Sequence, residues 1–322
     1  MFHGEVSPEI ARGLIHLRTC IAKAGIPSSC LDETLTVATW NIREFGRRRR
    51  TQAAIHYIAE IIGQFDLVAV TELRDNVEDL RRVLQILGPY WRVLFSDFNT
   101  DAAGNHERIA FVYDKRAVAW TGLAGEADPE KQKQGDDYVS KLEWWRSPYM
   151  ASFASGNFDF ILLAAHVRYG KSVKRRAAAI GALADWVDGR MGQKHVVDRD
   201  FFVLGDFNIT SRRSATFKAL TKHRLRIPGA LMQNRVLKAT NVRGTKPYDQ
   251  IAFDGHYTPE PLAAGVLSFT MEDLELLFPH DEYGLTPEQC TYQLSDHIPL
   301  WMQVDTDIDG ELLDQQAQPS DP

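Results

Sequence analysis

The chain has 322 residues, of which 44% are hydrophobic, 10% aromatic and 25% charged, as is ordinary for a globular protein. Its formal net charge of −6 argues, taken alone, against a nucleic-acid partner. The three cysteines, Cys20, Cys30 and Cys290, are odd in number and widely spaced, which argues against a disulfide framework or a zinc cluster and fits a reducing compartment.

One large domain with short extensions is expected, because no proline- or serine-rich linker interrupts the middle of the chain. The expected divisions are a helical extension over residues 1–34, a main domain over 35–304 and an acidic, disordered tail over 305–322. The first residues lack the basic and apolar regions of a signal peptide, and no apolar run is long enough to span a bilayer. We therefore expect a cytoplasmic protein that does not bind membranes, and we infer no obligate protein partner.

The first elements along the chain are a helix and a strand. Ser7-Pro8 is a good helix start, apolar residues follow at helical spacing, and Gly25 ends the helix. The β-branched run Leu35–Trp40 predicts a strand that leads into Asn41. Four arginines, Arg47–Arg50, then precede a predicted helix. They oppose the helix dipole unless an anion lies nearby, which favours a functional role over a solvated helix start.

Further strands also end in polar side chains. The apolar run Asp66–Thr71 predicts a strand followed by Glu72, and Phe158–Ala165 predicts a strand followed by His166. A lone histidine at a strand end is more often structural, but this one is followed by four basic residues between positions 171 and 176. The other predicted elements are a helix over 76–87, strands over 91–96, 109–113 and 149–154, and a polar surface loop over 121–140.

The most informative stretch is Phe201–Thr210, a short apolar run that predicts a buried strand ending in Gly-Asp-Phe-Asn. Period-2 alternation places Asp206 and Asn208 on one face and Phe207 on the other. An acid and an amide at the mouth of a buried strand can hold a metal or a phosphate oxygen, although Gly, Asp and Asn also form ordinary turns. Polar residues also stand at the beginning of two later strands, namely Asp249, Asp296 and His297.

The acids of the chain are concentrated at its C-terminal end. Removing the 6 acids that follow position 304 from the total of 43 leaves 37 acids against 37 bases, so the rest of the chain is neutral. The pattern Asp305-x-Asp307-x-Asp309-Gly310 is similar to the beginning of a calcium loop. Its twelfth position is Gln316, however, where such a site needs a bidentate Glu.

The polar residues at the strand ends are expected to meet, because an α/β sheet brings such positions to one rim. Oxygen ligands without cysteine suit Mg²⁺ or Mn²⁺, and two histidines with spare carboxylates suit acid–base chemistry. Basic clusters at 47–50, 171–176 and 212–213 make the rim cationic, which fits a phosphate-rich substrate. The set comprises Asn41, Glu72, His166, Asp206, Asn208, Asp249, Asp296 and His297, with Glu107 and Arg146 near further strands.

Five short motifs occur in order along the chain: Asn41-Ile-Arg-Glu-Phe-Gly, Thr71-Glu-Leu-Arg-Asp, Gly205-Asp-Phe-Asn, Tyr248-Asp-Gln-Ile and Ser295-Asp-His. Together they resemble the endonuclease/exonuclease/phosphatase superfamily, and within it the pancreatic-type (DNase I-like) deoxyribonucleases. The resemblance covers most of the chain, residues 35–304. It implies a four-layer α/β sandwich, in which two packed, mostly antiparallel β-sheets are flanked by helices.

The resemblance also implies roles for the matching residues. Glu72, with Asn41 nearby, would hold a divalent metal on the scissile phosphate; Mg²⁺ or Mn²⁺ is expected there, with Ca²⁺ as an alternative structural ion. Asp206 and Asp296 would help to bind the metal and to position the nucleophilic water. Asn208 would donate a hydrogen bond to a phosphate oxygen.

The acid–base pair implied by the resemblance is His166 and His297. Glu107 would orient the first imidazole and Asp249 the second. The arginines that match substrate contacts of the nucleases are Arg43, Arg74 and Arg146.

The resemblance and the cationic rim favour a divalent-metal-dependent endonuclease that binds and cleaves DNA. The alternative is a phosphoesterase of the same fold acting on a small-molecule or lipid phosphate, such as a sphingomyelinase-like or inositol-phosphatase-like enzyme. A non-enzymatic binding protein is a third alternative, which the complete acid–base set disfavours. The chain departs from the pancreatic enzymes at Asn105, where they have a Tyr, and in lacking their disulfides.

Overall fold

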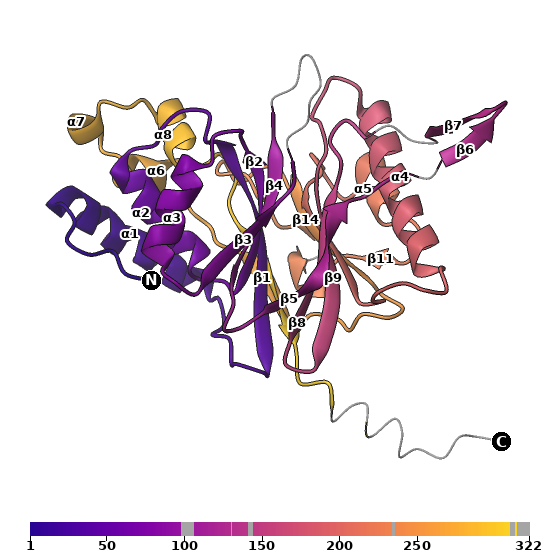
Figure 1. The fold of residues 1–322 in the computed structure, drawn as a ribbon. Coiled ribbons are helices and arrows are strands. Elements are labelled where there is room, and N and C mark those ends of the chain that lie inside the picture. Colours follow the sequence, from indigo (N-terminus) through magenta and orange to yellow (C-terminus); the bar gives the residue numbers. More distant parts are fainter. Residues whose placement is uncertain (98–105, 130, 141–143, 234–235, 310–312, 314–322) are drawn as a thin grey trace.

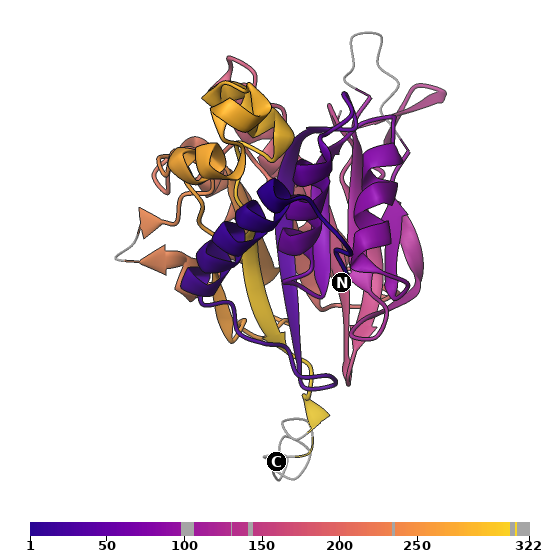
Figure 2. The same ribbon diagram turned by 90° about the vertical axis from the view of Figure 1, so that its left-hand side faces the viewer.

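The computed structural model describes residues 1–97, 106–129, 131–140, 144–233, 236–309 and 313. In this part of the chain two six-stranded β-sheets pack face to face between layers of helices (Figures 1 and 2). This arrangement confirms the predicted four-layer α/β sandwich. The helices outside the first sheet are α1 (Pro8–Ala24), α2 (Gln52–Ile62), α3 (Glu78–Leu87), α6 (Met271–Leu277), α7 (His280–Tyr283) and α8 (Pro287–Gln293), and those outside the second are α4 (Val173–Met191) and α5 (Ala215–Leu220).

The two sheets have related strand arrangements. The first contains β1 (Thr34–Phe45), β2 (Leu67–Leu73), β3 (Trp91–Phe95), β4 (Arg108–Asp114), β15 (Ala263–Val266) and β16 (Leu300–Asp305), in the order β15-β16-β1-β2-β4-β3. The second contains β5 (Ala119–Glu126), β8 (Tyr149–Ser155), β9 (Phe158–His166), β10 (Phe201–Asp206), β11 (Leu225–Arg226) and β14 (Asp249–Asp254), in the order β11-β14-β10-β9-β8-β5. Each sheet contains one parallel pair, β1–β2 or β9–β10, and its other described pairs are antiparallel.

Aromatic side chains between the sheets fix the direction in which the strand-end residues point. The ring of Phe111 from β4 lies 5.7 Å from that of Phe153 in β8, and Phe153 lies 5.9 Å from Phe160 in β9. Phe160 therefore faces the first sheet. His166 lies an even number of residues farther along the same strand, so alternation turns it to the same side.

The helix predicted between Ser7 and Gly25 is confirmed as α1. The Ser7 hydroxyl accepts a hydrogen bond from the backbone N–H of Ile10, and Gly25 ends the helix with a left-handed φ of 61°. Leu14 and Leu17 are buried in the cluster that α1 shares with α2 and the outer face of the first sheet. The extension before the sandwich is thus packed on it.

The prediction of a surface loop over 121–140 is wrong. This stretch contains β5 at the edge of the second sheet, and the hairpin of β6 (Lys131–Gln134) and β7 (Asp137–Ser140). Most of these residues are exposed, so the alternation of apolar and polar residues that reveals a half-buried strand is missing. The remaining small elements are a 3₁₀ turn over Gly229–Leu231 and the short pair β12 (Met232–Gln233) and β13 (Val236–Leu237).

Some sequence interpretations fall on positions outside the described residues. These are Asn105, and the Gly310 and Gln316 positions of the calcium-like pattern. Within the part of the chain that the structure describes, no helix combines the length and apolar character needed to cross a bilayer.

Gly205 is expected to be essential for the approach of β9 to β10. Its φ is +131°, and an added Cβ would lie 2.0 Å from the carbonyl oxygen of Ala165. Because backbone atoms cannot move aside at low cost, Gly205→Ala should lower the free energy of unfolding by about 2–4 kcal/mol, measured by urea denaturation. Gly189→Ala in α4 is the control, since no atom apart from the adjacent backbone of its own helix lies within 4 Å of its added Cβ. Equal losses in both variants would contradict this explanation.

Candidate active site

The carboxyl ends of the two parallel strand pairs meet beside a polar cavity of about 490 Å³. Pairing of β9 with β10 places His166 beside Asp206, and pairing of β10 with β14 places Asp249 opposite Asp206. Asn41 reaches the same place from β1 in the facing sheet, where its amide contacts Asp206. The cavity is lined by Arg43, Glu44, Glu72, Glu107, Trp145, Arg146, His166, Arg168, Tyr169, Gly170, Asp206, Asn208, Tyr292, Asp296 and His297.

Glu72 enters the cavity from an irregular part of β2. Its backbone is left-handed, with φ 62°, a conformation that costs a residue other than glycine about 1–3 kcal/mol. The carboxylate accepts hydrogen bonds from the backbone N–H of Glu44 at 2.8 Å and from Asn41 Nδ2 at 3.0 Å. Burial disfavours its charge, but the nearby His166 and these donors outweigh that effect, and the pKa of Glu72 is lowered.

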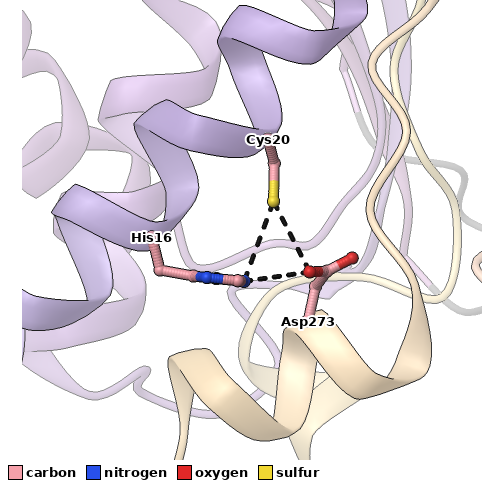
Figure 3. Close-up of side chains that lie close together, drawn as sticks. All are labelled: His16, Cys20 and Asp273. Carbon is pink, nitrogen blue, oxygen red and sulfur yellow. Dashed lines mark hydrogen bonds and ion pairs between the residues drawn. The ribbon is translucent and has the colours of Figure 1, made fainter.

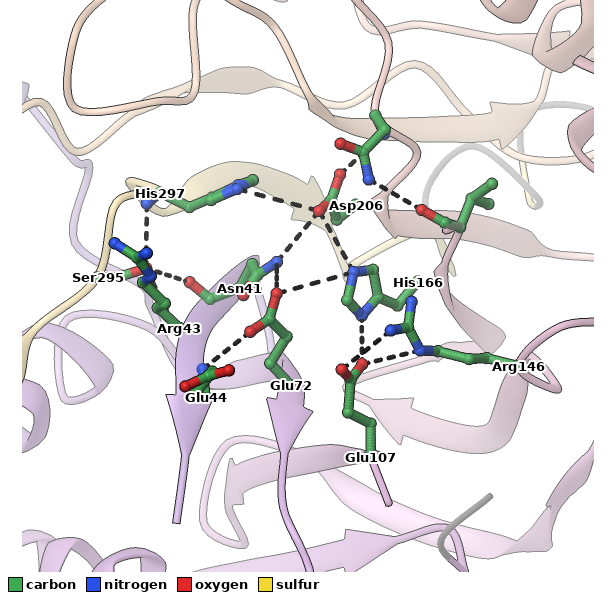
Figure 4. A network of polar contacts seen from close by, with 12 residues as sticks. Asn41, Arg43, Glu44, Glu72, Glu107, Arg146, His166, Asp206, Ser295 and His297 are labelled. Atoms are coloured by element: carbon green, nitrogen blue, oxygen red, sulfur yellow. Dashed lines mark hydrogen bonds and ion pairs between the residues drawn. The ribbon is translucent and has the colours of Figure 1, made fainter. Parts of the chain in front are cut away.

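Asn41 connects two acids that could hold a metal (Figure 4). Its Nδ2 donates to Glu72 Oε1 at 3.0 Å and to Asp206 Oδ2 at 3.1 Å. Among the described residues, Asn41 Oδ1 is buried and has no hydrogen-bond partner. Two carboxylates and an unsatisfied amide oxygen provide the oxygen ligands that Mg²⁺ and Mn²⁺ prefer, so the residues present fit such an ion.

His166 is oriented by an acid that is itself bound by arginines. Its Nδ1 lies 2.9 Å from Glu107 Oε2, and Arg146 binds both oxygens of Glu107 through Nε and Nη2, each at 2.9 Å. Arg74 Nη1 lies 3.6 Å from the same carboxylate. Burial opposes the charge of Glu107, but His166 and the two arginines outweigh it and lower its pKa to about 2. Glu107 is therefore a fixed anion behind the imidazole.

His297 has a comparable arrangement on the other side of the site. Its Nδ1 lies 2.7 Å from Asp249 Oδ2, and its backbone N–H donates to the Ser295 hydroxyl at 3.0 Å. Burial opposes protonation, but the charges of Asp249, Asp206 and Asp296 raise the pKa of His297 well above 6.5. His297 with Asp206 and Asp249 also forms a group whose ligand atoms lie within 4.8 Å of one another, a second arrangement with metal-binding chemistry.

Asp206 lies between the two imidazoles and is only 2% exposed. Its Oδ2 is 3.5 Å from His166 Nε2 and 4.0 Å from His297 Nε2 (Figure 4). Its Oδ1 accepts the backbone N–H of Asn208 at 2.8 Å. Burial raises the pKa of Asp206, and the adjacent imidazoles oppose that rise.

Asn208 and Asp296, the other predicted site residues, also line the cavity. Asn208 Nδ2 donates to the carbonyl oxygen of Val167 at 2.8 Å. The Asp296 side chain is 43% exposed and lies 4.0 Å from Arg43 Nη1. Phe207, which directly follows β10, is fully buried in the core, as predicted.

The three arginines predicted to bind substrate have different surroundings. Arg43 is partly exposed, and its guanidinium lies 3.7 Å from the ring centroid of Tyr292. Arg74 is buried between Glu107 and Glu44, whereas Arg146 lines the cavity while it binds Glu107. Arg43 and Arg146 therefore line the cavity, whereas Arg74 is not among its lining residues.

The functional role predicted for the whole run Arg47–Arg50 is wrong for Arg50. This side chain is buried and donates to the carbonyl oxygen of Arg43 at 2.6 Å and to that of Tyr292. Burial lowers its pKa to about 10. Arg50 therefore has a structural role, because it donates hydrogen bonds to main-chain carbonyl groups at the end of α8. The preceding three arginines are exposed.

Some site residues were not predicted. The Ser295 hydroxyl donates to the Asn41 carbonyl at 2.7 Å and so connects the segment before β16 to β1. Its position in the Ser-Asp-His motif is a signal that could have identified it. Trp145 and Tyr169 line the cavity from stretches without regular structure, and Arg168 lies 3.9 Å above the Trp145 ring. No periodic pattern marks these aromatic residues.

Residues 38–261 match the sequence profile of the Endonuclease/Exonuclease/phosphatase family. The chain belongs to this family. The resemblance to this superfamily that the sequence motifs indicated is thus confirmed. Members of the family are hydrolases of phosphoester bonds. The narrower resemblance to pancreatic-type enzymes stays a prediction.

Several solved structures share the fold of this family member. They include the human Nocturnin catalytic domain with bound sulfate (15% identity, TM-score 0.55, covering 86% of this chain and 95% of that one). Truncated Caenorhabditis elegans TDP2 has 15% identity and a TM-score of 0.55, with 84% and 97% coverage. The Bacteroides thetaiotaomicron mannosyl-6-phosphatase Bt3783 has 18% identity and a TM-score of 0.54, with 83% and 98% coverage. A comparison with curated proteins gave no match.

The raised pKa of His297 predicts how stability depends on pH. The folded state binds this proton more tightly than the unfolded chain, whose histidines titrate near 6.5. The resulting stabilisation is complete below that pH and is lost as the pH rises towards the folded-state pKa, by up to about 1.4 kcal/mol per pH unit. Urea unfolding with EDTA should show this slope in the wild type and not in His297→Gln. Parallel pH profiles of the two proteins would contradict the assignment.

Proposed function

We propose that this protein is an Mg²⁺- or Mn²⁺-dependent phosphodiester hydrolase that acts as an endonuclease on DNA. One observation carries the proposal: two imidazoles, each paired with a buried acid, lie on either side of Asp206. Glu72 and Asn41 adjoin Asp206 as further ligands. A divalent cation held by these three residues would neutralise charge on the phosphoryl oxygens.

The protein's own groups supply the proton transfers of hydrolysis. A bond forms between the phosphorus and the oxygen of water, and the bond from phosphorus to the leaving oxygen breaks. His166, with Nδ1 facing Glu107, accepts the proton of the water at Nε2. His297 carries a proton because its pKa is raised, and it donates that proton to the leaving oxygen.

Other residues position the reacting groups. Asp206 Oδ2 lies near both imidazole Nε2 atoms, where it can accept a hydrogen bond from the attacking water. Asn208 Nδ2 uses one hydrogen for the Val167 carbonyl, and the second is available to a phosphate oxygen. Asp296, which lines the cavity, helps to bind the metal and to position the attacking water.

The charge around the cavity supports DNA as the substrate. Arg43 and Arg168 line the cavity itself. Exposed cations lie nearby in sequence, before α2 and at the beginning of α4, and such groups bind phosphates along a backbone. They are Arg47, Arg48, Arg49, Lys171, Lys174 and Arg175.

A second cavity favours a second candidate function, hydrolysis of a small-molecule phosphoester. This cavity also has a volume of about 490 Å³ and shares six lining residues with the first, among them Trp145, Arg146 and His166. Trp144 and Leu183 add apolar surface, and its cationic residues include Lys171, Arg175 and Arg176. Such a lining fits an anionic ligand that also carries an apolar or aromatic group.

Incubation of the purified protein with supercoiled plasmid tests the proposal. Nicking is expected with Mg²⁺ or Mn²⁺ and not with EDTA. Glu72→Gln should slow nicking by about 10²–10⁴-fold, because it removes a charged ligand beside the reacting phosphate. Glu78→Gln is the control, since this side chain is exposed on α3 away from the cavity, and it should nick like the wild type.

Two results would contradict the endonuclease proposal. If the plasmid stays intact while an aryl phosphodiester or phosphomonoester is hydrolysed in a Glu72-dependent manner, the second candidate replaces it. If Glu72→Gln nicks as fast as the wild type, the assigned site is not the source of the activity.

A further inference from the structure

Three side chains of types that can bind a metal lie together between α1 and α6, on elements that do not line either cavity. His16 and Cys20 are four residues apart in α1, so their side chains project from one face of the helix. Asp273 lies in the first turn of α6 and faces both of them (Figure 3). Neither α1 nor α6 is within residues 38–261, which match the family.

Two of the three separations between the ligand atoms are close to those found around a tetrahedral ion. Cys20 Sγ lies 3.7 Å from His16 Nε2 and 3.5 Å from Asp273 Oδ1. Zinc bonds of the usual lengths at a tetrahedral angle place sulfur, nitrogen and oxygen ligands about 3.3–3.6 Å apart. His16 Nε2 and Asp273 Oδ1 are closer, at 2.9 Å, since a hydrogen bond joins them here.

The surroundings hold the ligand atoms in place. Asp273 Oδ2 accepts hydrogen bonds from the backbone N–H of Thr270 at 2.8 Å and from its hydroxyl at 2.9 Å. This capping interaction engages Oδ2 and leaves Oδ1 to face α1. Carboxylates that bind metals are commonly held in place by hydrogen bonds of this kind. Cys20 is buried, whereas the side chains of His16 and Asp273 are 30% and 22% exposed. One side of the group is therefore accessible to solvent.

We propose that His16, Cys20 and Asp273 form a zinc site, with water as the fourth ligand. A thiolate and an imidazole favour zinc over Mg²⁺, which takes oxygen ligands, so this site and the catalytic one select different ions. The proposal does not rest on the proposed function. The wide spacing of the cysteines argues only against a site built from cysteines, and this one uses a single cysteine with ligands of other kinds.

The zinc ion would join the N-terminal extension to the C-terminal part of the sandwich. His16 and Asp273 are 257 positions apart in the chain, so the ion closes a very long loop. Near it, Arg12 on α1 pairs with Glu282 on α7, and Leu14 and Leu17 are packed in the core. Bound zinc should therefore strengthen a contact that already exists and raise the melting temperature.

Metal analysis of the full chain without a histidine tag tests the proposal. After growth with zinc and gel filtration, the wild type should retain one zinc per chain, measured by inductively coupled plasma mass spectrometry. Cys20→Ser and His16→Gln should lose it. Cys30→Ser and His195→Gln are the controls, because both side chains are exposed and lie outside the group, and they should keep the metal.

Cobalt titration of the chelator-treated protein distinguishes this site from the catalytic centre. The wild type should develop a thiolate-to-cobalt charge-transfer band with tetrahedral d–d bands, and its melting temperature should rise. Cys20→Ser should show neither change, while its near-ultraviolet circular dichroism matches that of the wild type. The catalytic cavity has no cysteine in its lining, so an ion bound there cannot give the band. Absence of the band in the wild type, or equal zinc retention by Cys20→Ser, would show that the three residues share hydrogen bonds only.

Discussion

The carboxylate of Asp206 is the constraint on which the rest of the site depends. It is almost fully buried, and a buried charge persists only with partners that compensate it. Those partners come from both sheets: the Asn41 amide from the first, and His166 from the second. The charge of Asp206 is therefore compensated only when the two sheets are packed together. The carboxylates and the unsatisfied Asn41 oxygen also make the place suitable for a cation.

The regular core of the sandwich fixes the positions of the residues in the irregular site. Aromatic rings between the sheets, such as Phe153 and Phe160, hold the strands in register, and period-2 alternation then turns the strand-end residues inwards. Near the site the backbone departs from ideal geometry, with left-handed φ values at Glu72 and Asn208 and a close approach at Gly205. The surrounding strands stabilise these strained conformations, because they fix the positions from which the polar side chains project.

His166 and Asp206 could be predicted as site residues from the sequence because each follows a short apolar run that forms a buried strand. Arg50 could not be separated from its three neighbours, since its role depends on carbonyl groups of α8 far along the chain. Edge strand β5 was missed because exposure removes the apolar alternation. The contact of His16 with Asp273 joins positions so distant that no local pattern reveals it. Local chemistry was thus predictable, whereas long-range pairing was predicted only where the family resemblance implied it, as for His166 with Glu107.

The proposed metal site is formed by Glu72, Asn41 and Asp206 beside two oriented imidazoles. Crystals containing Mn²⁺ and inorganic phosphate, measured for anomalous scattering, test it most directly. We expect an anomalous peak bonded to Glu72, Asn41 and Asp206, with the phosphate within hydrogen-bond distance of His297. A peak held by Asp249 and His297 with Glu72 unbound, or no peak in the cavity at saturating Mn²⁺, would contradict it.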